Sequence, residues 1–214
     1  MKGLFITFEG TEGSGKTTII NQIRDCLMNH GYQVIQTREP GGGVIAEQIR
    51  NVILNVENTK MDRITEALLY AASRRQHLTE IVIPHLENGD IVLCDRYLDS
   101  SLAYQGYARG IGIDKVYDIN QFAIDGILPD LTIYIDVHPQ IGLDRITKNH
   151  RDQNRLDLET KNFHELVYKG YQEVINRFKD RIVRVNGEQD INKVYENVKE
   201  IIFSFLERRH VSKS

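Results

Sequence analysis

Gly10-Thr11-Glu12-Gly13-Ser14-Gly15-Lys16-Thr17 is the stretch of this 214-residue sequence that decides its fold. It matches the pattern Gly-x-x-x-x-Gly-Lys-[Ser/Thr], in which backbone N–H groups of a glycine-rich loop surround phosphate oxygens. An apolar run over residues 4–8 precedes the loop, and an amphipathic stretch follows it with Ile19, Ile20, Ile23 and Leu27. A strand before the loop and a helix after it distinguish a phosphate-binding loop from a merely structural glycine turn. We therefore expect a nucleoside triphosphate here, with the Lys16 ammonium on its β- and γ-phosphates and the Thr17 hydroxyl on Mg²⁺.

Five short apolar runs alternate with stretches of helical periodicity along the chain. The runs cover residues 4–8, 33–37, 91–94, 131–137 and 182–185. Strands that alternate with helices predict a parallel sheet, and the near-continuous apolar character of these runs indicates strands covered on both faces. The expected fold class is α/β, a doubly wound parallel five-stranded sheet flanked by helices. We expect one domain over residues 1–206, with a short mobile lid at about 145–158 and a polar tail at 207–214.

The composition excludes several classes of protein. Thirty acidic against 27 basic residues give a formal net charge of −3, so the overall charge predicts neither a nucleic-acid nor a membrane partner. No run of 18 apolar residues occurs, and the first residues do not have the pattern of a signal peptide. Cys26 and Cys94 lack metal-ligand spacing and are expected to be reduced core residues of a cytoplasmic protein.

Arginines occur where an anionic phosphoryl acceptor would need them. A phosphate monoester is already a nucleophile at neutral pH, so transfer to it requires no general base but does require cations that offset charge repulsion. Residues just past the ends of parallel strands converge on the ligand edge of the sheet, which brings Arg38 and Arg96 to the phosphate loop. Further candidate cations in the helices and the lid are Arg50, Arg74, Arg151 and Arg155.

Asp95 and the residues after it predict a second part of the site. An apolar strand ending in Asp resembles the second nucleotide-binding motif of phosphate-loop proteins, whose carboxylate orients Mg²⁺ or its waters. The alternative is an ordinary Asp/Arg pair that closes a strand, and the phosphate loop makes it less favourable. Tyr97, Ser101, Tyr104 and Gln105 then share one side of a helix and can hydrogen-bond a base. A polar surface helix would account poorly for two tyrosines and a glutamine on one side.

Three further segments have both a functional and a structural interpretation. Tyr70 and Arg74 lie four residues apart in a long helical stretch, so a ring that can stack on a base lies beside a guanidinium that can donate to its carbonyls. As an isolated pair they would more often be structural. Glu39-Pro40-Gly41-Gly42-Gly43 has the composition of a tight loop against a ligand, although a plain turn looks similar. Residues 145–157 are nearly all polar; a solvated loop is the default, but such a segment can close over a triphosphate and exclude water.

Together these segments resemble the thymidylate kinase family of the nucleoside monophosphate kinases. The motifs are Phe8-Glu9-Gly10-Thr11-Glu12-Gly13-Ser14-Gly15-Lys16-Thr17-Thr18, Thr37-Arg38-Glu39-Pro40-Gly41-Gly42, residues 65–75, Asp95-Arg96-Tyr97, residues 100–106 and Pro129-Asp130-Leu131-Thr132. The resemblance implies the P-loop NTPase fold and transfer of the γ-phosphoryl group of ATP to dTMP, giving ADP and dTDP, with Mg²⁺ as cofactor. It also implies a cytoplasmic homodimer whose partners are these two nucleotides, without nucleic acid or membrane.

The resemblance further implies roles for single residues. Tyr70 would take the place of the aromatic residue that stacks on thymine, Arg74 and Gln105 would hydrogen-bond its edge, and Ser101 would lie nearby. Tyr104 would exclude a ribose 2′-hydroxyl, and Glu12 would lie near the sugar 3′-hydroxyl. The residues expected to bind dTMP are Glu12, Arg38, Glu39, Arg50, Tyr70, Arg74, Arg96, Ser101, Tyr104 and Gln105, of which Arg38, Arg50 and Arg96 would hold the acceptor phosphate. Those expected to bind ATP are Gly10, Thr11, Glu12, Gly13, Ser14, Gly15, Lys16, Thr17 and Thr18.

Catalysis by resemblance depends on cations and one metal site. The phosphate loop has Glu12 and no arginine, which resembles the subgroup whose lid supplies the catalytic cation. The expected catalytic residues are Lys16, Arg96, Arg151 and Arg155. Thr17 and Asp95 are the expected metal ligands.

Two alternatives stay open for the sequence alone. A kinase of another nucleotide or of a free nucleoside shares much of the pattern, but a nucleoside hydroxyl needs a base to activate it, whereas the arginines favour a charged acceptor. A nucleotide-dependent switch is the second alternative. It would leave the tyrosine-bearing faces unexplained, and the chain has no Asn-Lys-x-Asp guanine-reading segment.

Overall fold

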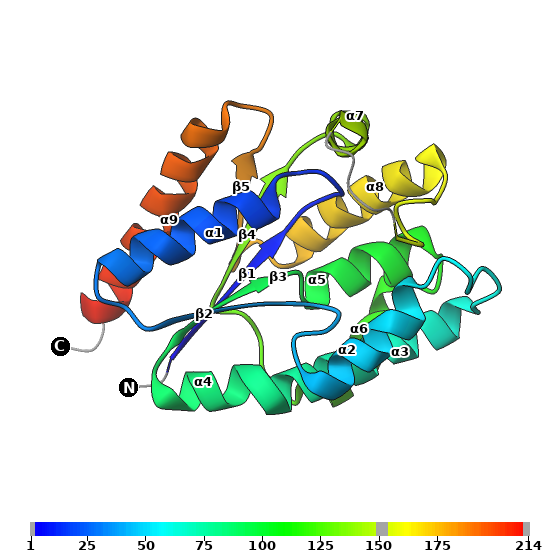
Figure 1. Ribbon diagram of the computed structural model, residues 1–214, viewed down its shortest axis with the longest axis horizontal. Coiled ribbons are helices and arrows are strands. Elements are labelled where there is room, and N and C mark those ends of the chain that lie inside the picture. The colour runs from blue at the N-terminus through cyan, green and yellow to red at the C-terminus, as the bar shows by residue number, and fades with distance from the viewer. Residues whose placement is uncertain (1–2, 149–153, 212–214) are drawn as a thin grey trace.

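A five-stranded parallel sheet runs through the centre of the computed structural model, which describes residues 3–148 and 154–211 (Figure 1). Its strands are β1 (Leu4–Glu9), β2 (Val34–Arg38), β3 (Ile91–Asp95), β4 (Leu131–Asp136) and β5 (Ile182–Asn186). They pair in the order β2-β3-β1-β4-β5, and every pair is parallel. This confirms the predicted doubly wound sheet. Each strand begins and ends within one residue of its predicted run.

Helices cover both faces of the sheet because its strands are apolar on both sides. One face is covered by α1 (Lys16–Asn29) and α9 (Ile191–Val211), which pack on alternate residues of β1 such as Ile6 and Phe8. Phe5, one position before Ile6, points to the opposite face and belongs to the second hydrophobic cluster. This alternation follows from the two-residue period of a strand. It gives one core on each side of the sheet.

The remaining helices form the second layer and the ligand edge. They are α2 (Val44–Leu54), α3 (Arg63–His77), η1 (Leu78–Val82), α4 (Ile83–Asn88), α5 (Leu98–Ser101), η2 (Leu102–Ala108), α6 (Ile113–Ile124), α7 (Pro139–Lys148) and α8 (Lys161–Arg177). The predicted long helix therefore exists as α3, η1 and α4, with a wider π-helical segment in the middle. Asp62 caps α3, since its carboxylate accepts from the backbone N–H groups of Ile64 and Thr65 at 2.9 and 3.0 Å.

The C-terminal segment and one cysteine differ from expectation. Helix α9 continues to Val211, whereas the sequence predicted a polar tail from residue 207. Arg209 accounts for part of this extension, because its Nη2 donates to the Gly3 carbonyl at 3.2 Å and its Nη1 lies 3.4 Å from the Asp130 carboxylate. Cys94 is buried as predicted, but Cys26 is only half-buried, and both are free thiols. No helix in the described part of the chain is long and apolar enough to cross a membrane.

Candidate active site

A cavity of about 590 Å³ lies at the carboxyl edge of the sheet and brings together most of the predicted site residues. The predicted residues that line it are Glu12, Gly13, Ser14, Gly15, Lys16, Thr17, Thr18, Arg38, Glu39, Arg50, Tyr70, Arg74, Asp95, Arg96, Tyr104 and Gln105. Gly10, Thr11, Ser101 and Arg155 do not line it. Arg151 lies outside the described residues. One cavity thus contains the phosphate loop, the arginines and the aromatic face.

The phosphate loop has the backbone that its glycines permit. Gly13 and Gly15 have φ of 70° and 90°, the left-handed region in which glycine pays no Cβ penalty. Helix α1 begins at Lys16, so its N-terminal N–H groups lie against the cavity. The Lys16 ammonium donates to the carbonyls of Gly10 and Thr11 at 3.1 and 3.0 Å. Burial, together with the nearby Arg96 charge, lowers the pKa of Lys16 to about 8.

Helix α7 packs directly on this loop. A Cβ on Gly13 would lie 2.0 Å from the Gly142 carbonyl oxygen, and a Cβ on Gly142 would lie 2.0 Å from the Glu12 carbonyl oxygen. The two backbones can approach this closely only because both residues are glycine. The helix that leads into the predicted lid is therefore in contact with the phosphate loop.

Arg96 lies between the phosphate loop and the aromatic face. Its Nη1 donates to the Gly10 carbonyl at 2.9 Å and to the Tyr171 hydroxyl at 3.0 Å, and its Nη2 lies 3.0 Å from a Glu12 carboxylate oxygen. Its guanidinium carbon is 5.2 Å from the centre of the Tyr104 ring. Burial lowers the pKa of Arg96, but the Glu12 carboxylate, the Tyr104 and Tyr171 hydroxyls and the Asp95 carboxylate together outweigh burial and raise that pKa above its usual range. Arg96 is therefore a permanent cation whose side chain is 16% exposed.

The backbone of Arg96 is strained. Its φ of 71° is in the left-handed region, which costs a non-glycine residue of order 1–3 kcal/mol. Hydrogen bonds on both sides hold it there: Arg96 N donates to the Phe8 carbonyl at 2.9 Å, and Tyr97 N donates to a Glu9 carboxylate oxygen at 2.7 Å. The strain directs the guanidinium back over the phosphate loop.

Glu9 helps to hold Arg96 and its neighbours in place, and it was not among the predicted site residues. Its carboxylate also accepts from the hydroxyls of Ser100 and Tyr171 at 2.6 and 2.9 Å. Burial and the nearby Asp99 raise the pKa of Glu9 to about 7. The available signal was a charged residue inside a strand whose six residues are all buried.

Thr17 and Asp95 form a pair of oxygen donors at the mouth of the loop. The Thr17 hydroxyl donates to Asp95 Oδ2 at 2.9 Å. No cluster of three or more His, Cys, Asp or Glu residues suited to a metal occurs in the described part of the chain. Mg²⁺ is commonly bound by one or two protein oxygens, substrate phosphates and waters, so this pair fits a magnesium ion that enters with a nucleotide.

Arg38 and Arg50 form a cationic wall beyond the second strand. Arg38 is exposed and pairs with Glu47, to which it donates at 2.7 and 3.1 Å. Arg50 Nη1 donates to the Pro40 carbonyl at 2.7 Å. Burial and the neighbouring Arg38 charge lower the pKa of Arg50. An anionic ligand between the two guanidinium groups would relieve this repulsion.

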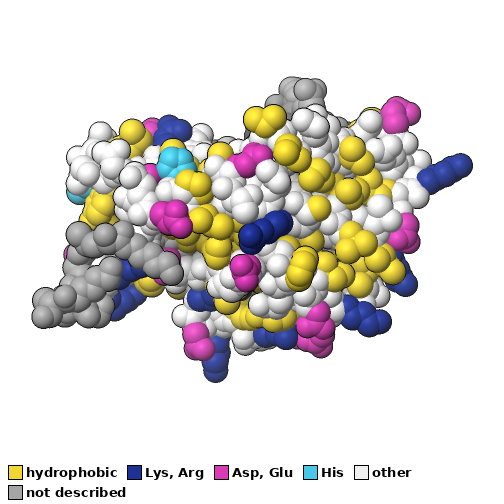
Figure 2. Space-filling model, turned by 90° about the horizontal axis from the view of Figure 1, so that it is seen from below, with side chains coloured by type: hydrophobic (Ala, Val, Ile, Leu, Met, Phe, Trp, Pro, Cys, Tyr) yellow, Lys and Arg dark blue, Asp and Glu magenta, His cyan; other side chains and the backbone are white. Residues whose placement is uncertain are grey.

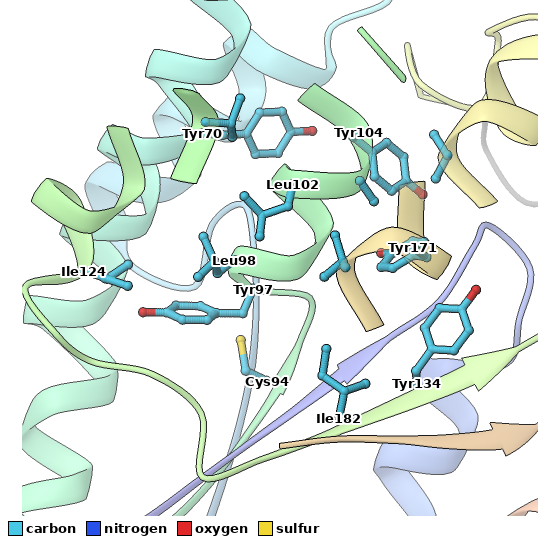
Figure 3. Packing of buried hydrophobic residues seen from close by; sticks show 14 of the residues in the cluster. Tyr70, Cys94, Tyr97, Leu98, Leu102, Tyr104, Ile124, Tyr134, Tyr171 and Ile182 are labelled. Atoms are coloured by element: carbon cyan, nitrogen blue, oxygen red, sulfur yellow. The ribbon is translucent and has the colours of Figure 1, made fainter. Parts of the chain in front are cut away.

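Tyr70 and Arg74 lie on α3 and line the cavity. Figure 3 shows the Tyr70 and Tyr104 rings at the upper edge of the hydrophobic cluster. The buried Arg74 donates from Nε to Glu39 Oε2 at 2.7 Å and from Nη2 to the Tyr97 carbonyl and the Ser101 hydroxyl. Its Nη1 also donates to Asn120 Oδ1. Of its five N–H groups, one on Nη1 has no acceptor among the described residues. The predicted base-reading guanidinium is thus held rigidly.

Two further hydrogen bonds connect side chains at this end of the cavity. The Tyr104 hydroxyl donates to Glu12 Oε1 at 2.9 Å, and Gln105 Nε2 donates to Glu66 Oε1 at the same distance.

Arg155 has a different environment from the one predicted for a lid cation. Its Nε donates to the Ile53 carbonyl at 2.8 Å, and its Nη2 lies 2.6 Å from Glu66 Oε2. Its neighbours Asn154 and Leu156 do line the cavity. Arg155 therefore connects this part of the predicted lid segment to α2 and α3.

Other residues also line the cavity. Arg145 and Ile146 of α7 belong to the predicted lid segment but were not among the predicted site residues, and Gly187, Gln189 and Ile191 after β5 were not predicted at all. The rule that ligands bind beyond the carboxyl ends of parallel strands applies to β5 as well and was the signal that could have found the last three.

Comparisons with known proteins agree with one another. The family model for thymidylate kinase matches residues 8–198. Thymidylate kinase of Clostridium novyi is 58% identical over 199 residues, which cover 92% of this chain and 97% of that protein. Thymidylate kinase of Oceanobacillus iheyensis is 58% identical over 210 residues, or 98% and 93% of the two chains. A crystal structure of thymidylate kinase from Ehrlichia chaffeensis has a TM-score of 0.76 and 32% identity, with coverage of 94% of this chain and 99% of that one.

Proposed function

The chain belongs to the thymidylate kinase family, and from that premise we propose how its residues transfer the γ-phosphoryl group of ATP to dTMP, giving ADP and dTDP. The observation that carries the proposal is the single cavity that joins the phosphate loop to an arginine-bearing aromatic pocket. The loop residues 10–18 hold the phosphates of ATP. Lys16 and Arg96 stabilise charge on the transferring group, and Arg96 with Arg38 and Arg50 holds the acceptor phosphate.

The aromatic end of the cavity binds the thymidine part of the acceptor. Tyr70 stacks on the base, which is worth about 1–3 kcal/mol. The remaining N–H of Arg74 and the Gln105 amide bind the base edge. Tyr104 and Glu12, already linked by a hydrogen bond, lie against the sugar. Because Tyr104 is buried there, its ring leaves little room for a ribose 2′-hydroxyl.

Thr17 and Asp95 hold Mg²⁺ in this proposal. The metal supplies charge neutralisation for the β- and γ-phosphates when it is bound with ATP. The chain contributes the geometry of the two oxygen donors, which the hydrogen bond between them already brings together.

The lid cation is proposed to come from Arg151 or Arg155. Arg155 reaches a transferring phosphoryl group only if its bonds to Ile53 and Glu66 break. Arg151 lies outside the described residues. Alanine variants of each would separate the two: the residue that acts on the transition state lowers kcat, whereas an anchor chiefly lowers stability.

A coupled ADP-release assay over the common ribo- and deoxyribonucleoside monophosphates tests the proposed roles. We expect a strong preference for dTMP, full dependence on Mg²⁺ after chelation with EDTA, and a lower kcat/KM for dTMP in a Tyr70→Ala variant, which loses the stacking ring. Preference for AMP or CMP would contradict the base-site assignment. Activity that persists without a divalent cation would contradict the metal assignment.

The pKa of Lys16 sets an alkaline limit on the use of ATP. The ammonium is charged below pH 8 and loses its proton as the pH rises through about 8, so kcat/KM for ATP should then fall about tenfold for each pH unit. Bound phosphates raise this pKa, so kcat itself should persist to higher pH. Steady-state rates measured across the alkaline pH range give both kcat/KM for ATP and kcat. The activity that remains in Lys16→Arg should lack this decline, because guanidinium does not titrate there.

A homodimer is proposed from an exposed apolar face on α2, α3 and α6. Figure 2 shows hydrophobic side chains gathered on the part of the lower surface that these helices occupy in Figure 1. The exposed residues of this face are Val44, Ile45, Val52, Ile64, Leu68 and Phe122, and Phe122 is 93% exposed. An apolar side chain this exposed on a continuous face is typical of a protein interface.

The variant Phe122→Glu should therefore convert the protein to monomers. A carboxylate placed on both sides of a two-fold interface adds like-charge repulsion and removes apolar burial. Light scattering should change from twice the chain mass of 24.7 kDa to that mass. Met28→Glu on α1, where Met28 is also exposed, is the matched control and should stay dimeric. A wild-type protein that is monomeric at all concentrations would contradict the proposal.

We also propose the cytoplasm as its location. Free Cys26 and Cys94 suit a reducing compartment, which is where cellular ATP is used for nucleotide synthesis.

A further inference from the structure

Gln105 is chemically ambiguous as a reader of a pyrimidine base. Its amide has an oxygen that accepts and a nitrogen that donates. In one orientation the amide complements thymine, which offers N3–H as donor and O4 as acceptor. Rotated by half a turn, it complements cytosine, which offers N3 as acceptor and its amino group as donor. A single terminal torsion therefore decides which base the same residue favours.

Glu66 removes this ambiguity. Gln105 Nε2 donates to Glu66 Oε1 at 2.9 Å, and both side chains are only 1% exposed. An ionised carboxylate can only accept, so a rotated amide would place two oxygens against each other in a buried site. No donor to Gln105 Oε1 occurs among the described residues. The oxygen is thus left for a ligand in the cavity that Gln105 lines.

Two arginines keep Glu66 ionised. Arg109 donates to both carboxylate oxygens at 3.2 Å, and Arg155 Nη2 lies 2.6 Å from Oε2. Burial raises the pKa of Glu66, but the hydrogen bonds from Gln105 and from the two arginines outweigh burial and bring that pKa below its usual value. Glu66 therefore accepts from Gln105 throughout the neutral range.

The helices hold this pair against the base pocket. Glu66, Tyr70 and Arg74 follow one another at intervals of one turn on α3, and Ser101 and Gln105 do so across α5 and η2. Arg74 contacts Ser101 at one end of this row, and Glu66 contacts Gln105 at the other. The row that carries the proposed stacking ring thus also carries the residue that orients Gln105.

We propose that Glu66 determines base choice by holding Gln105 with Oε1 toward the base, so that the site accepts N3–H of thymine and rejects the N3 lone pair of cytosine. The inference rests on the proposed function, in which Gln105 reads the base edge. Glu66 does not itself line the cavity and is a positioning residue. Arg74 remains a second, independent source of preference for O4.

The test compares dTMP with 5-methyl-dCMP, which keeps the methyl group and differs only at positions 3 and 4. In Glu66→Gln the partner amide can donate or accept, so Gln105 is free to rotate. The ratio of kcat/KM for 5-methyl-dCMP to that for dTMP should rise at least about tenfold, the scale of one well-formed paired contact to a base edge. The ratio for dUMP, which differs from dTMP only by the methyl group, should not change.

Arg109→Gln is the matched control, because it loosens the same charged cluster and leaves the bond between Glu66 and Gln105 in place. Its substrate ratio should equal that of the wild type. If Glu66→Gln lowers kcat/KM for both substrates by the same factor, Glu66 is only structural and the proposal is wrong. If Glu66→Gln does not fold, Glu66→Asp keeps the charge but withdraws the carboxylate, and the same rise in the ratio is expected.

Gln105→Met separates this proposal from the proposed function. A large loss of dTMP use in Gln105→Met, together with an unchanged ratio in Glu66→Gln, would overturn the role of Glu66 and leave the contact between Gln105 and the base intact. Unchanged dTMP use in Gln105→Met would remove that contact and the role of Glu66 with it.

Discussion

Arg96→Met will lower kcat by about 10²–10³-fold, the usual effect of removing one preorganised charge-stabilising donor. Arg96 contacts the Gly10 carbonyl and Glu12 of the phosphate loop and lies over the Tyr104 ring. It is therefore the cation between the proposed donor and acceptor sites. Because its contacts already hold the guanidinium in place, little reorganisation is needed when charge develops on the transferring group. Single-turnover rates with saturating ATP and dTMP measure the chemical step directly.

Two further variants separate the effect of the charge from the effects of guanidinium geometry and backbone strain. Arg96→Lys keeps a charge but not the planar fork, so its rate should lie between those of wild type and Arg96→Met. Arg96→Gly should be as slow as Arg96→Met but more stable than it by about 1 kcal/mol, because glycine adopts a φ of 71° without strain. A rise in KM for dTMP with unchanged kcat would show that Arg96 only binds the acceptor.

The sheet and the phosphate loop were predictable because their signals are local. A short, mostly apolar run predicts each strand, and an eight-residue motif predicts the loop. Neither prediction requires knowledge of residues that are distant in sequence. The π-helical segment η1 inside the predicted long helix had no such signal. Its apolar residues continue the pattern of α3, and only the packed structure reveals the wider turn.

The site was predictable where position relative to strand ends determines it. Arg38 is the last residue of β2 and Arg96 follows β3, and both line the cavity as the rule for parallel sheets predicts. Arg155 shows the limit of this reasoning. Its environment depends on the Ile53 carbonyl and on Glu66, which is 89 residues away in sequence. The spacing of polar residues in the lid contains no information about that partner.

Glu39→Ala will destabilise the fold by about 3–5 kcal/mol, the cost of leaving a buried charge without its partner. Glu39 is 4% exposed and accepts from Arg74 Nε at 2.7 Å, and it lies 2.9 Å from His77 Nδ1. Without the carboxylate, Arg74 keeps its charge while it is only 1% exposed and has lost its ion-pair partner. Glu39→Gln retains an oxygen for Arg74 and should lose less. Urea unfolding measures the difference, and Glu196→Gln in an exposed pair on α9 should change stability by less than about 1 kcal/mol.

The same variant links stability to dTMP binding, because Glu39 orients the guanidinium proposed to read the thymine edge. If that link holds, KM for dTMP should rise in Glu39→Ala while KM for ATP changes little. Saturating dTMP should stabilise Glu39→Ala less than it stabilises the wild type, since stabilisation by a ligand follows its affinity for the folded state. A variant that loses stability yet keeps the wild-type KM for dTMP would show that Glu39 supports the fold without orienting Arg74 toward the base.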